Sequence, residues 1–583
     1  MSVSRSGRSI LARQPLFLPT TRRELDDLGW DELDILLVQG DAYLDHPAQG
    51  PALLGRWLVA HGFRVGVISQ PRWKDKDEAE ADLTAMGRPR LFAALSAGSM
   101  DSMLAHYTAF RKLRRDDALT PGGKSGARPN RATLVYTGLV RAVFPGLKVF
   151  LGGLEASLRR LSHYDFWQDK LRRSVLLESK ADLLIYGPGE RPLLELARRL
   201  SGAGPEPGLE DIPGTALARP ADFSPGDKVL VLPGHEEILE NPKLLMTATV
   251  ASERLIHLGG RAAFQISGQR GVLVQPPAEA LTTAELDFLY GLPFNRRAHP
   301  SYQQPVPALE MLAGSLTTHR GCGGGCSFCS LALHQGRRVS SRSEESILEE
   351  AGSLSRILAA GKNRSGEKRP KAVALSDVGA ATANLWGAKC LGEQEKCRRS
   401  SCLWPRICPQ LSADQGRWLG LLKKIGALEG VKQVRVASGV RYDLALTDKA
   451  ALQEFLRHFA GGQLKVAPEH LDADILNLMR KPPLKVFEQF LEVFDKEAGA
   501  GRFVIPYLIS AFPGSDIPKM KALASWFQRR RWRPRQVQAF IPTPGTVATA
   551  MYYGGVDEKG RPLAVARSDR ERLAQHSFLA PGP

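Results

Sequence analysis

The chain has 583 residues, which is enough for two to four domains, and its scattered rather than periodic Gly and Pro exclude a collagen-like protein. Its net charge of +18 suits a nucleic acid or an anionic small molecule, but a solvated basic surface has the same composition. The sequence lacks an apolar run of about 18 residues, which argues against a transmembrane helix and membrane partners. Seven clustered cysteines argue against a secreted disulfide framework and indicate a cytoplasmic protein.

The first part of the chain has the pattern of an α/β domain. Residues 1–24 are rich in Arg and Ser and are expected to form a basic flexible tail. From 25 to 205, short apolar runs alternate with amphipathic segments, which is typical of a Rossmann-like open sheet of parallel strands. The predicted strands are DILLVQ (34–39), RVGVIS (64–69), TLVYTG (133–138), KVFLGG (148–153) and DLLIYG (182–187).

The second part repeats this alternation after a gap. Residues 206–304 begin near a Gly/Pro-rich stretch and are interpreted as a linker or bridging segment. Residues 305–550 hold six predicted strands and intervening helices, which indicates a partial (β/α)6 TIM-like barrel, and 551–583 a C-terminal tail. The strands are predicted at 316–322, 372–377, 433–439, 463–469, 503–512 and 536–542, and the helices at 343–360, 412–426, 447–459, 484–497 and 516–531.

The most specific motif follows the first of these six strands. In RGCGGGCSFCSL (320–331) the spacing is Cys322-x3-Cys326-x2-Cys329. A [4Fe–4S] cluster held by three thiolates keeps one iron open, and an open metal position can bind a substrate. The three glycines between the first two cysteines let the backbone wrap around such a cluster. The alternative is a zinc site, which His334 could complete, or inert cysteines.

This motif resembles the radical S-adenosylmethionine (radical SAM) superfamily. Further stretches, among them GGLEASLRRLSHYDFW, TTHRGCGGGCSFCSLALHQGR, CRRSSCLWPRICP and SGVRYDLA, are similar to the YgiQ family within it, also called UPF0313, over about 15–555. The resemblance implies that SAM chelates the open iron of the [4Fe–4S] cluster. One electron then cleaves SAM into methionine and a 5′-deoxyadenosyl radical, which abstracts a substrate hydrogen. An electron donor such as flavodoxin or ferredoxin is implied as a partner.

The resemblance also carries over candidate SAM-binding positions. They lie at the ends of the predicted barrel strands, where capping or turn formation is the alternative role. One pair of residues, Ala380 and Ala381, replaces a Gly-Pro of relatives, so the loop after the second strand can differ in shape. The candidate positions are Phe328, Ser376, Asp377, Ser438, Arg441, Glu469, Pro513 and Gly514.

A second cysteine set lies in an insertion at about 385–410. Cys390, Cys397, Cys402 and Cys408 are surrounded by Lys and Arg, which stabilise thiolates. Four thiolates can close a tetrahedral zinc site or hold a second, fully ligated iron–sulfur cluster. Redox-inert cysteines are the remaining alternative.

Several radical SAM enzymes carry a cobalamin-binding domain before the barrel, with an Asp-x-His-x-x-Gly motif. Here Asp45 is adjacent to His46 and Gly50 follows four residues later, so the motif does not match. The sequence therefore argues against cobalamin.

The sequence predicts a radical SAM enzyme and assigns neither its substrate nor catalytic residues beyond the cluster ligands. The alternative is a basic RNA-binding iron–sulfur protein, or a radical SAM enzyme that modifies RNA, because QRRRWRPRQ (528–536) combines arginines with an aromatic residue. SAM cleavage distinguishes the enzymes from the binding protein, and salt-dependent RNA binding would support either nucleic-acid version.

Overall fold

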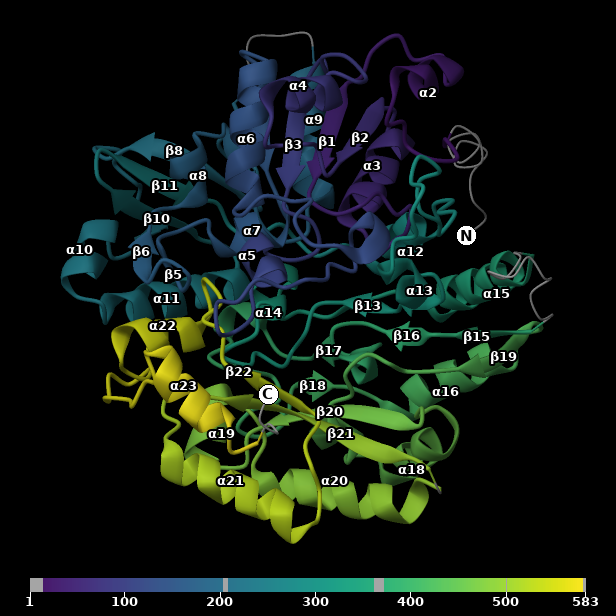
Figure 1. Cartoon of the computed structure of the whole chain (residues 1–583), viewed down its shortest axis with the longest axis vertical. Helices are drawn as coiled ribbons and strands as arrows, with labels where there is room; N and C mark the ends of the chain where they lie inside the picture. Colours follow the sequence, from purple (N-terminus) through teal and green to yellow (C-terminus); the bar gives the residue numbers. More distant parts are fainter. Residues whose placement is uncertain (1–13, 203–207, 361–371, 500, 580–583) are drawn as a thin grey trace. The chain divides into compact units, whose positions relative to one another are not determined.

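The computed structural model describes residues 14–202, 208–360, 372–499 and 501–579. Within these residues the chain forms two compact units, each built from several segments (Figure 1). The first unit takes its residues from Met1–Asn241, Gly259–Ala280 and Phe288–Ala313, and the second from Pro242–Leu258, Leu281–Asp287 and Gly314–Pro583. The domain limits expected from the sequence stay a prediction.

A nine-stranded sheet, in the order β2-β1-β3-β4-β7-β8-β11-β10-β9, forms the first unit. Its first five strands are parallel, and their order is that of a flavodoxin-like doubly wound sheet. The next strands, β8 and β11, run antiparallel to their neighbours. The strands are β1 (Ile35–Gln39), β2 (Val65–Ser69), β3 (Phe92–Ser96), β4 (Lys148–Leu151), β7 (Leu183–Ile185), β8 (Thr215–Pro220), β9 (Val229–Val231), β10 (Ala262–Ser267) and β11 (Arg270–Val274).

Four of the five strands predicted here are confirmed, as β1, β2, β4 and β7. The strand predicted at 133–138 is wrong, because these residues belong to helix α6 (Ala132–Val143). Strand β3 was not predicted. Four strands, β8 to β11, lie in the stretch that the sequence indicated as a bridging segment, and they extend the same sheet.

In the second unit, each of the six segments predicted as barrel strands overlaps an observed strand. β12 pairs in parallel with β16, β15 with β19, and β20 with β21, which in turn pairs with β22. These strands are β12 (Ser315–Thr317), β15 (Val373–Leu375), β16 (Asp377–Gly379), β19 (Val431–Val434), β20 (Gln463–Glu469), β21 (Phe503–Ser510) and β22 (Gln536–Ala539). All five predicted helices are confirmed, as α15 (Glu344–Ala360), α16 (Gln415–Gly426), α18 (Lys449–His458), α20 (Leu484–Glu497) and α21 (Ile517–Arg529).

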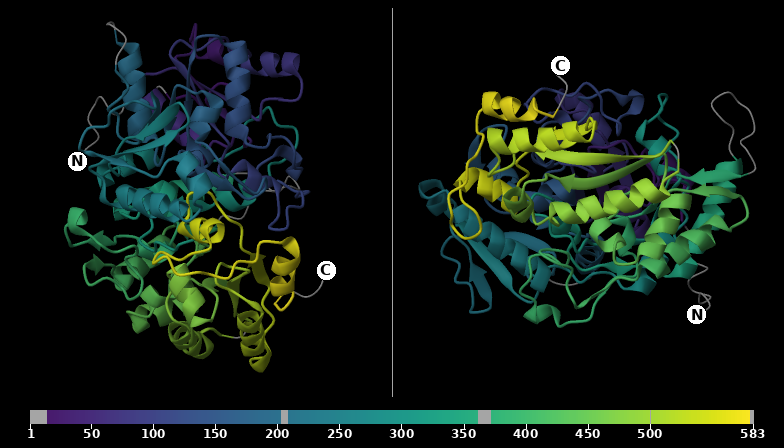
Figure 2. Two further views of the ribbon diagram at one scale, coloured as in Figure 1. Left: turned by 90° about the vertical axis from the view of Figure 1, so that its left-hand side faces the viewer. Right: turned by 90° about the horizontal axis from the view of Figure 1, so that it is seen from below.

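Helices α20 and α21 lie along one face of β20 and β21 (Figures 1 and 2). In α20, Phe487, Phe490 and Phe494 recur at helical spacing and are buried in one cluster with Trp526 and Phe527 of α21. This core fixes the fourth and fifth strands. Among the described residues, no helix is both long and apolar enough to cross a membrane.

A buried histidine of the first unit predicts a pH-dependent stability. Burial and the nearby Arg296 guanidinium, 2.9 Å from Nε2, lower the pKa of His46 to about 3. On acidification the unfolded state binds a proton near its ordinary pKa of about 6.5, whereas the native state does not. We therefore expect His46 to remove about 2 kcal/mol of stability between pH 7 and pH 5. Urea unfolding at both pH values should show this loss in the wild type and not in His46→Gln; equal losses would contradict it.

Candidate functional site

The three-cysteine loop is closed at its base by a short hairpin. Strand β13 (His319–Arg320) pairs with β14 (Ser340–Ser341). The Gly321 N–H donates to Gln335 Oε1 at 3.2 Å, and the Cys322 N–H donates to the Gly336 carbonyl at 3.1 Å. The loop therefore leaves and re-enters the hairpin at neighbouring points, and its cysteines are held between them.

The three thiols face a common region. A Cβ added to Gly324 would lie 3.3 Å from Cys322 Sγ and 3.8 Å from Cys326 Sγ, so a larger residue here would crowd both sulfurs. Burial, together with the neighbouring Cys326 and Cys322 thiols, raises the pKa of Cys329 to about 12. All three cysteines are free. Within the described parts of the chain, no three His, Cys, Asp or Glu side chains lie close enough to hold a single metal ion.

Arg441 brings a positive charge to these thiols. Its Nε and Nη2 donate to the carboxylate of Asp443 at 2.9 and 2.6 Å, and its Nη1 lies 3.8 Å from Cys326 Sγ. Burial alone would raise the pKa of the Asp443 carboxyl, but the Arg441 guanidinium outweighs this effect and holds the pKa below its usual value. On the other side, Thr382 Oγ1 lies 3.2 Å from Cys322 Sγ. Cys326 and Cys322 therefore each have a polar partner from outside the loop.

Two other predicted SAM-binding residues bind each other. Asp377, in β16, accepts hydrogen bonds from the backbone N–H groups of Ala437 and Ser438 at 2.9 and 3.0 Å, and from the Ser438 hydroxyl. The pair ties the end of the second predicted strand to the loop after the third. Ser376 donates its N–H to the Gly314 carbonyl at 3.0 Å.

Glu469 ends β20 in a strained conformation. Its φ is +70°, unusual for a residue other than glycine, and the register of β20 against β21 shifts just before it. Burial raises the pKa of the Glu469 carboxyl, although Lys481 Nζ lies 4.0 Å away. Such backbone strain is frequent at functional sites.

The remaining predicted positions surround an aromatic contact. Phe328 of the cysteine loop meets Phe512 edge-to-face, with ring centroids 6.3 Å apart. Pro513 and Gly514 follow Phe512, and Gly514 has a φ of +90°. A Cβ there would lie 2.8 Å from Leu478, so this turn requires glycine.

A recess lies beside the cysteine loop within the second unit. Cys326, Cys329 and Arg337 line it together with Glu253 and His257 of helix α11 (Leu244–Leu258). Both ring nitrogens of His257 are buried without a hydrogen-bond partner. Arg337 ends the stretch TTHRGCGGGCSFCSLALHQGR, which resembles the YgiQ family. No sequence motif indicates its contacts or those of helix α11.

Arg480 anchors the cysteine loop and was not predicted from the sequence. Its side chain is 1% exposed and forms ion pairs with Glu253 at 2.7 Å and Glu558 at 2.9 Å. The same guanidinium donates to the Gly325 carbonyl at 3.2 Å. The Arg480 guanidinium therefore joins the cysteine loop to Glu253 and Glu558, two residues far away in sequence.

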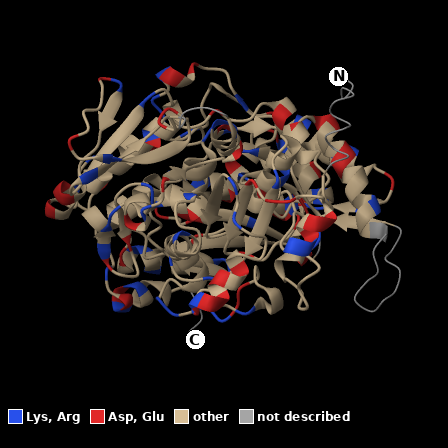
Figure 3. Ribbon diagram, turned by 90° about the horizontal axis from the view of Figure 1, so that it is seen from above, with Lys and Arg blue, Asp and Glu red and all other residues tan. Residues whose placement is uncertain are grey.

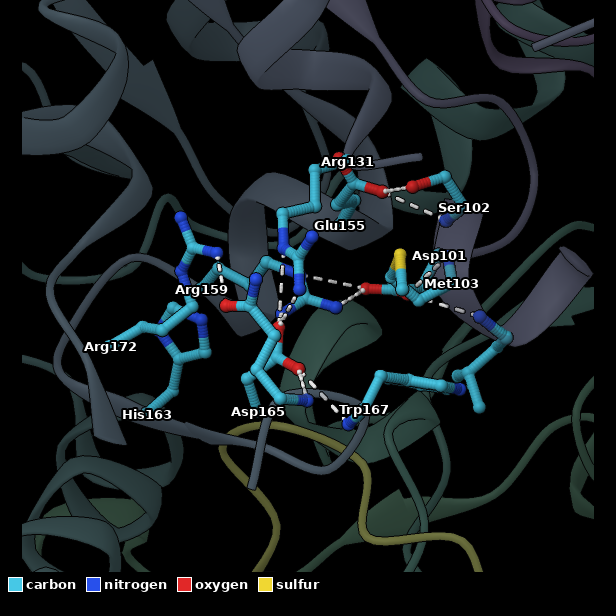
Figure 4. A network of polar contacts seen from close by, with 12 residues as sticks. Asp101, Ser102, Met103, Arg131, Glu155, Arg159, His163, Asp165, Trp167 and Arg172 are labelled. Atoms are coloured by element: carbon cyan, nitrogen blue, oxygen red, sulfur yellow. Dashed lines mark hydrogen bonds and ion pairs between the residues drawn. The ribbon is translucent and has the colours of Figure 1, made fainter. Parts of the chain in front are cut away.

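In the first unit, the stretch GGLEASLRR forms a buried polar network (Figure 4). Helix α7 (Gly153–Leu158) directly follows β4, and its Glu155 accepts hydrogen bonds from the N–H groups of Ser102 and Thr133 at 2.8 and 3.0 Å. Arg159 pairs with Asp101 at 2.7 Å. The network therefore joins α7 to residues 101–102 and 133 of the same unit.

Comparison with known proteins places the chain. A family model described as radical SAM N-terminal matches residues 17–315. A UPF0313 protein of Geobacter sulfurreducens is 47% identical, over 97% of this chain and 92% of that protein. The chain belongs to the UPF0313 family. A further member, YgiQ of Salmonella typhimurium, is 40% identical over 97% of this chain and 85% of its own length. The resemblance seen in the sequence is confirmed.

The fold is similar to that of a solved radical SAM protein. TsrM of Kitasatospora setae, a radical S-adenosylmethionine methyltransferase, has a TM-score of 0.50 and 13% identity, and the likeness covers 94% of this chain and 90% of TsrM. At this identity the likeness concerns the fold alone, an α/β fold with a large, mainly parallel sheet.

The expectation against cobalamin is wrong. A second TsrM structure with cobalamin and a [4Fe–4S] cluster bound also has a TM-score of 0.50, over 94% of this chain. The expectation used one short motif, whereas a fold of this kind holds the cofactor in TsrM. The absence of that motif therefore does not exclude cobalamin.

Proposed function

We propose that this protein is a radical SAM enzyme whose Cys322, Cys326 and Cys329 hold a [4Fe–4S] cluster with one open iron. The observation that carries the proposal is the convergence of three free thiols on one glycine-rich loop, in a chain of a radical SAM family. When bound and reduced, the cluster supplies the electron that cleaves SAM and so yields the radical that abstracts a substrate hydrogen.

The residues present fit such a cluster. A tetrahedral zinc ion, with Zn–S bonds of about 2.3 Å, needs thiolates about 3.8 Å apart. Cluster thiolates bind different irons and stand farther apart. We propose a cluster rather than a zinc site completed by His334 because the Cys-x3-Cys-x2-Cys spacing occurs in a chain matched by a radical SAM family model.

The chain's own residues bind, orient and shield. Arg441 neutralises charge next to Cys326, and Phe328 with Phe512 forms an apolar wall near the loop. We place SAM against the ends of the six parallel strands, which we propose form a partial (β/α)6 barrel after the Rossmann-like sheet. SAM would contact Phe328, Ser376, Asp377, Ser438, Arg441, Glu469, Pro513 and Gly514.

The nucleic-acid-binding alternative is not favoured. Two arginines of this stretch have partners within the second unit: Arg530 stacks 3.8 Å from the centre of the Trp526 ring and pairs with Glu488, and Arg535 lies over the Phe503 ring. Trp532 packs against Phe527. Lys and Arg are interspersed with Asp and Glu along the elements (Figure 3). The basic stretch thus closes α21 by internal contacts.

The deciding experiment is the anaerobic reconstitution of the full chain with iron and sulfide, followed by dithionite and SAM. We expect 5′-deoxyadenosine and methionine in equal amounts. The reconstitution is done with and without cobalamin, because a structure of similar fold holds that cofactor. A cluster-loaded protein that forms no 5′-deoxyadenosine under either condition, with dithionite or reduced flavodoxin, would overturn the proposal.

A further inference from the structure

The second cysteine set is gathered by the backbone of its insertion. Strands β17 (Lys389–Cys390) and β18 (Leu411–Ser412) pair antiparallel and close its base, with Cys390 opposite Leu411. The Leu411 N–H donates to the Cys408 carbonyl at 2.9 Å, and the Cys408 N–H donates to the Cys402 carbonyl at 2.8 Å. These bonds bring three of the four cysteines to one end of the insertion.

The fourth cysteine lies in the same insertion. Cys397 follows the 3₁₀ turn Gln394–Lys396, which contacts helix α11, and its N–H donates to the Gln394 carbonyl at 3.0 Å. Two residues further on, the Arg399 carbonyl accepts from the Arg337 guanidinium, which also lies 3.9 Å from Cys402 Sγ. None of the four cysteines is in a disulfide.

This insertion lies directly against the three-cysteine loop. The Cys402 N–H donates to the Gly323 carbonyl at 2.8 Å, and the Ser401 hydroxyl donates to the Gly324 carbonyl at 2.6 Å. A Cβ on Gly325 would collide with the Ser400 carbonyl. The glycines of the first loop are therefore required not only around a cluster but also for the close approach of the insertion.

Arg337 connects the two cysteine sets. It is buried, its Nη1 donates to the Arg399 carbonyl at 2.7 Å, and its Nη2 lies 3.9 Å from Cys402 Sγ. It also lines the recess beside Cys326 and Cys329. One guanidinium thus places positive charge beside thiols of both sets, as two anionic centres would require.

We propose that Cys390, Cys397, Cys402 and Cys408 hold a second iron–sulfur cluster, ligated entirely by protein, and that its loop braces the loop of the first. A zinc ion held by the same four thiolates is the alternative, and the iron, sulfide and zinc content distinguishes the two. The metal-binding part of this inference is independent of the proposed function, whereas the bracing part rests on it.

The test counts iron, acid-labile sulfide and zinc in the anaerobically reconstituted full chain. We expect about eight irons in the wild type, and about four in each of two variants: Cys322→Ser/Cys326→Ser/Cys329→Ser and Cys402→Ser/Cys408→Ser. The reduced cluster of the second variant should change its electron paramagnetic resonance signal on addition of SAM, and that of the first should not. Thermal melting of both variants controls for misfolding.

Two outcomes would overturn the second cluster. The first is a folded triple variant without iron and sulfide. The second is one zinc per chain that is lost in Cys402→Ser/Cys408→Ser. If iron and sulfide remain in the triple variant but the wild type cleaves no SAM, the second cluster stands and the proposed function fails.

The bracing contact is tested with two neighbouring serines. Ser401→Ala removes the hydroxyl that binds the Gly324 carbonyl, whereas Ser400→Ala keeps the backbone carbonyl that faces Gly325. With an iron chelator, the SAM-responsive signal should decay several-fold faster in Ser401→Ala than in Ser400→Ala or the wild type. Equal decay of the SAM-responsive signal in all three proteins would overturn the bracing role.

Discussion

Replacing Cys326 by alanine is expected to lower the rate of SAM cleavage at least about 10³-fold, because a group of ligands that acts together fails when one is lost. Cys326 is the middle one of the three proposed ligands, and its sulfur also faces Arg441 Nη1 at 3.8 Å. Without it a second iron would have no protein ligand, and the buried guanidinium would keep only its pair with Asp443. The measurement is 5′-deoxyadenosine formed per minute by the reconstituted, dithionite-reduced variant.

The matched control is Ser330→Ala. Ser330 directly follows Cys329 and precedes helix α14 (Leu331–Gln335), but its side chain makes no capping hydrogen bond there. This variant should keep the wild-type rate and iron content. Cys326→Ala, in contrast, should lose the iron of one cluster and keep that of the second set. Wild-type cleavage by Cys326→Ala would contradict the three-ligand assignment.

Hydrophobic runs predicted most strands, but a short window confused one helix with a strand. TLVYTG has the β-branched and aromatic residues typical of strands. In α6, however, Thr133, Tyr136, Thr137 and Val140 are buried at helical spacing, and the Thr137 hydroxyl donates to the Thr133 carbonyl at 2.7 Å. Only a window longer than six residues shows this period. Strand β3 escaped notice because its Ala-rich FAALS has little β-propensity.

The sequence brings out the three cysteines as candidate ligands, which stay a prediction, but it does not indicate the residues that hold their loop in place. A three-cysteine spacing is local in sequence and has a chemical reason, so it is visible in one chain. Arg337 and Arg480 act through backbone carbonyls and partners far away in sequence, and Glu253 reaches Arg480 from helix α11. Only the tertiary fold brings such residues together. The glycines of the loop likewise have two roles. Besides leaving room around the cysteines, they allow Ser400 and Cys402 to approach closely, and the motif itself does not indicate this second contact.

The second large effect is expected for Arg480→Met. The variant should lose about 3–5 kcal/mol of stability, because breaking a buried ion pair leaves an uncompensated charge. Here two carboxylates, Glu253 and Glu558, and the Gly325 carbonyl lose their donor at once. The free energy of unfolding is measured with urea on the protein without metal, so that metal binding does not contribute.

Lys423→Met is the matched control. Lys423 pairs with Glu454 at 2.6 Å, but the two side chains are 49% and 37% exposed, and such surface pairs contribute about 0–1 kcal/mol. If Arg480→Met changed stability no more than Lys423→Met, the ion pairs of Arg480 would be dispensable for the fold. A large loss in Arg480→Met, together with faster release of iron from the three-cysteine loop, would show that the stability of the second unit and the retention of its cluster depend on the same buried charge. The loop would then be held by two independent contacts, Arg480 on the Gly325 carbonyl and Ser401 on the Gly324 carbonyl. Loss of either contact should speed the release of iron, and loss of both should release the cluster completely.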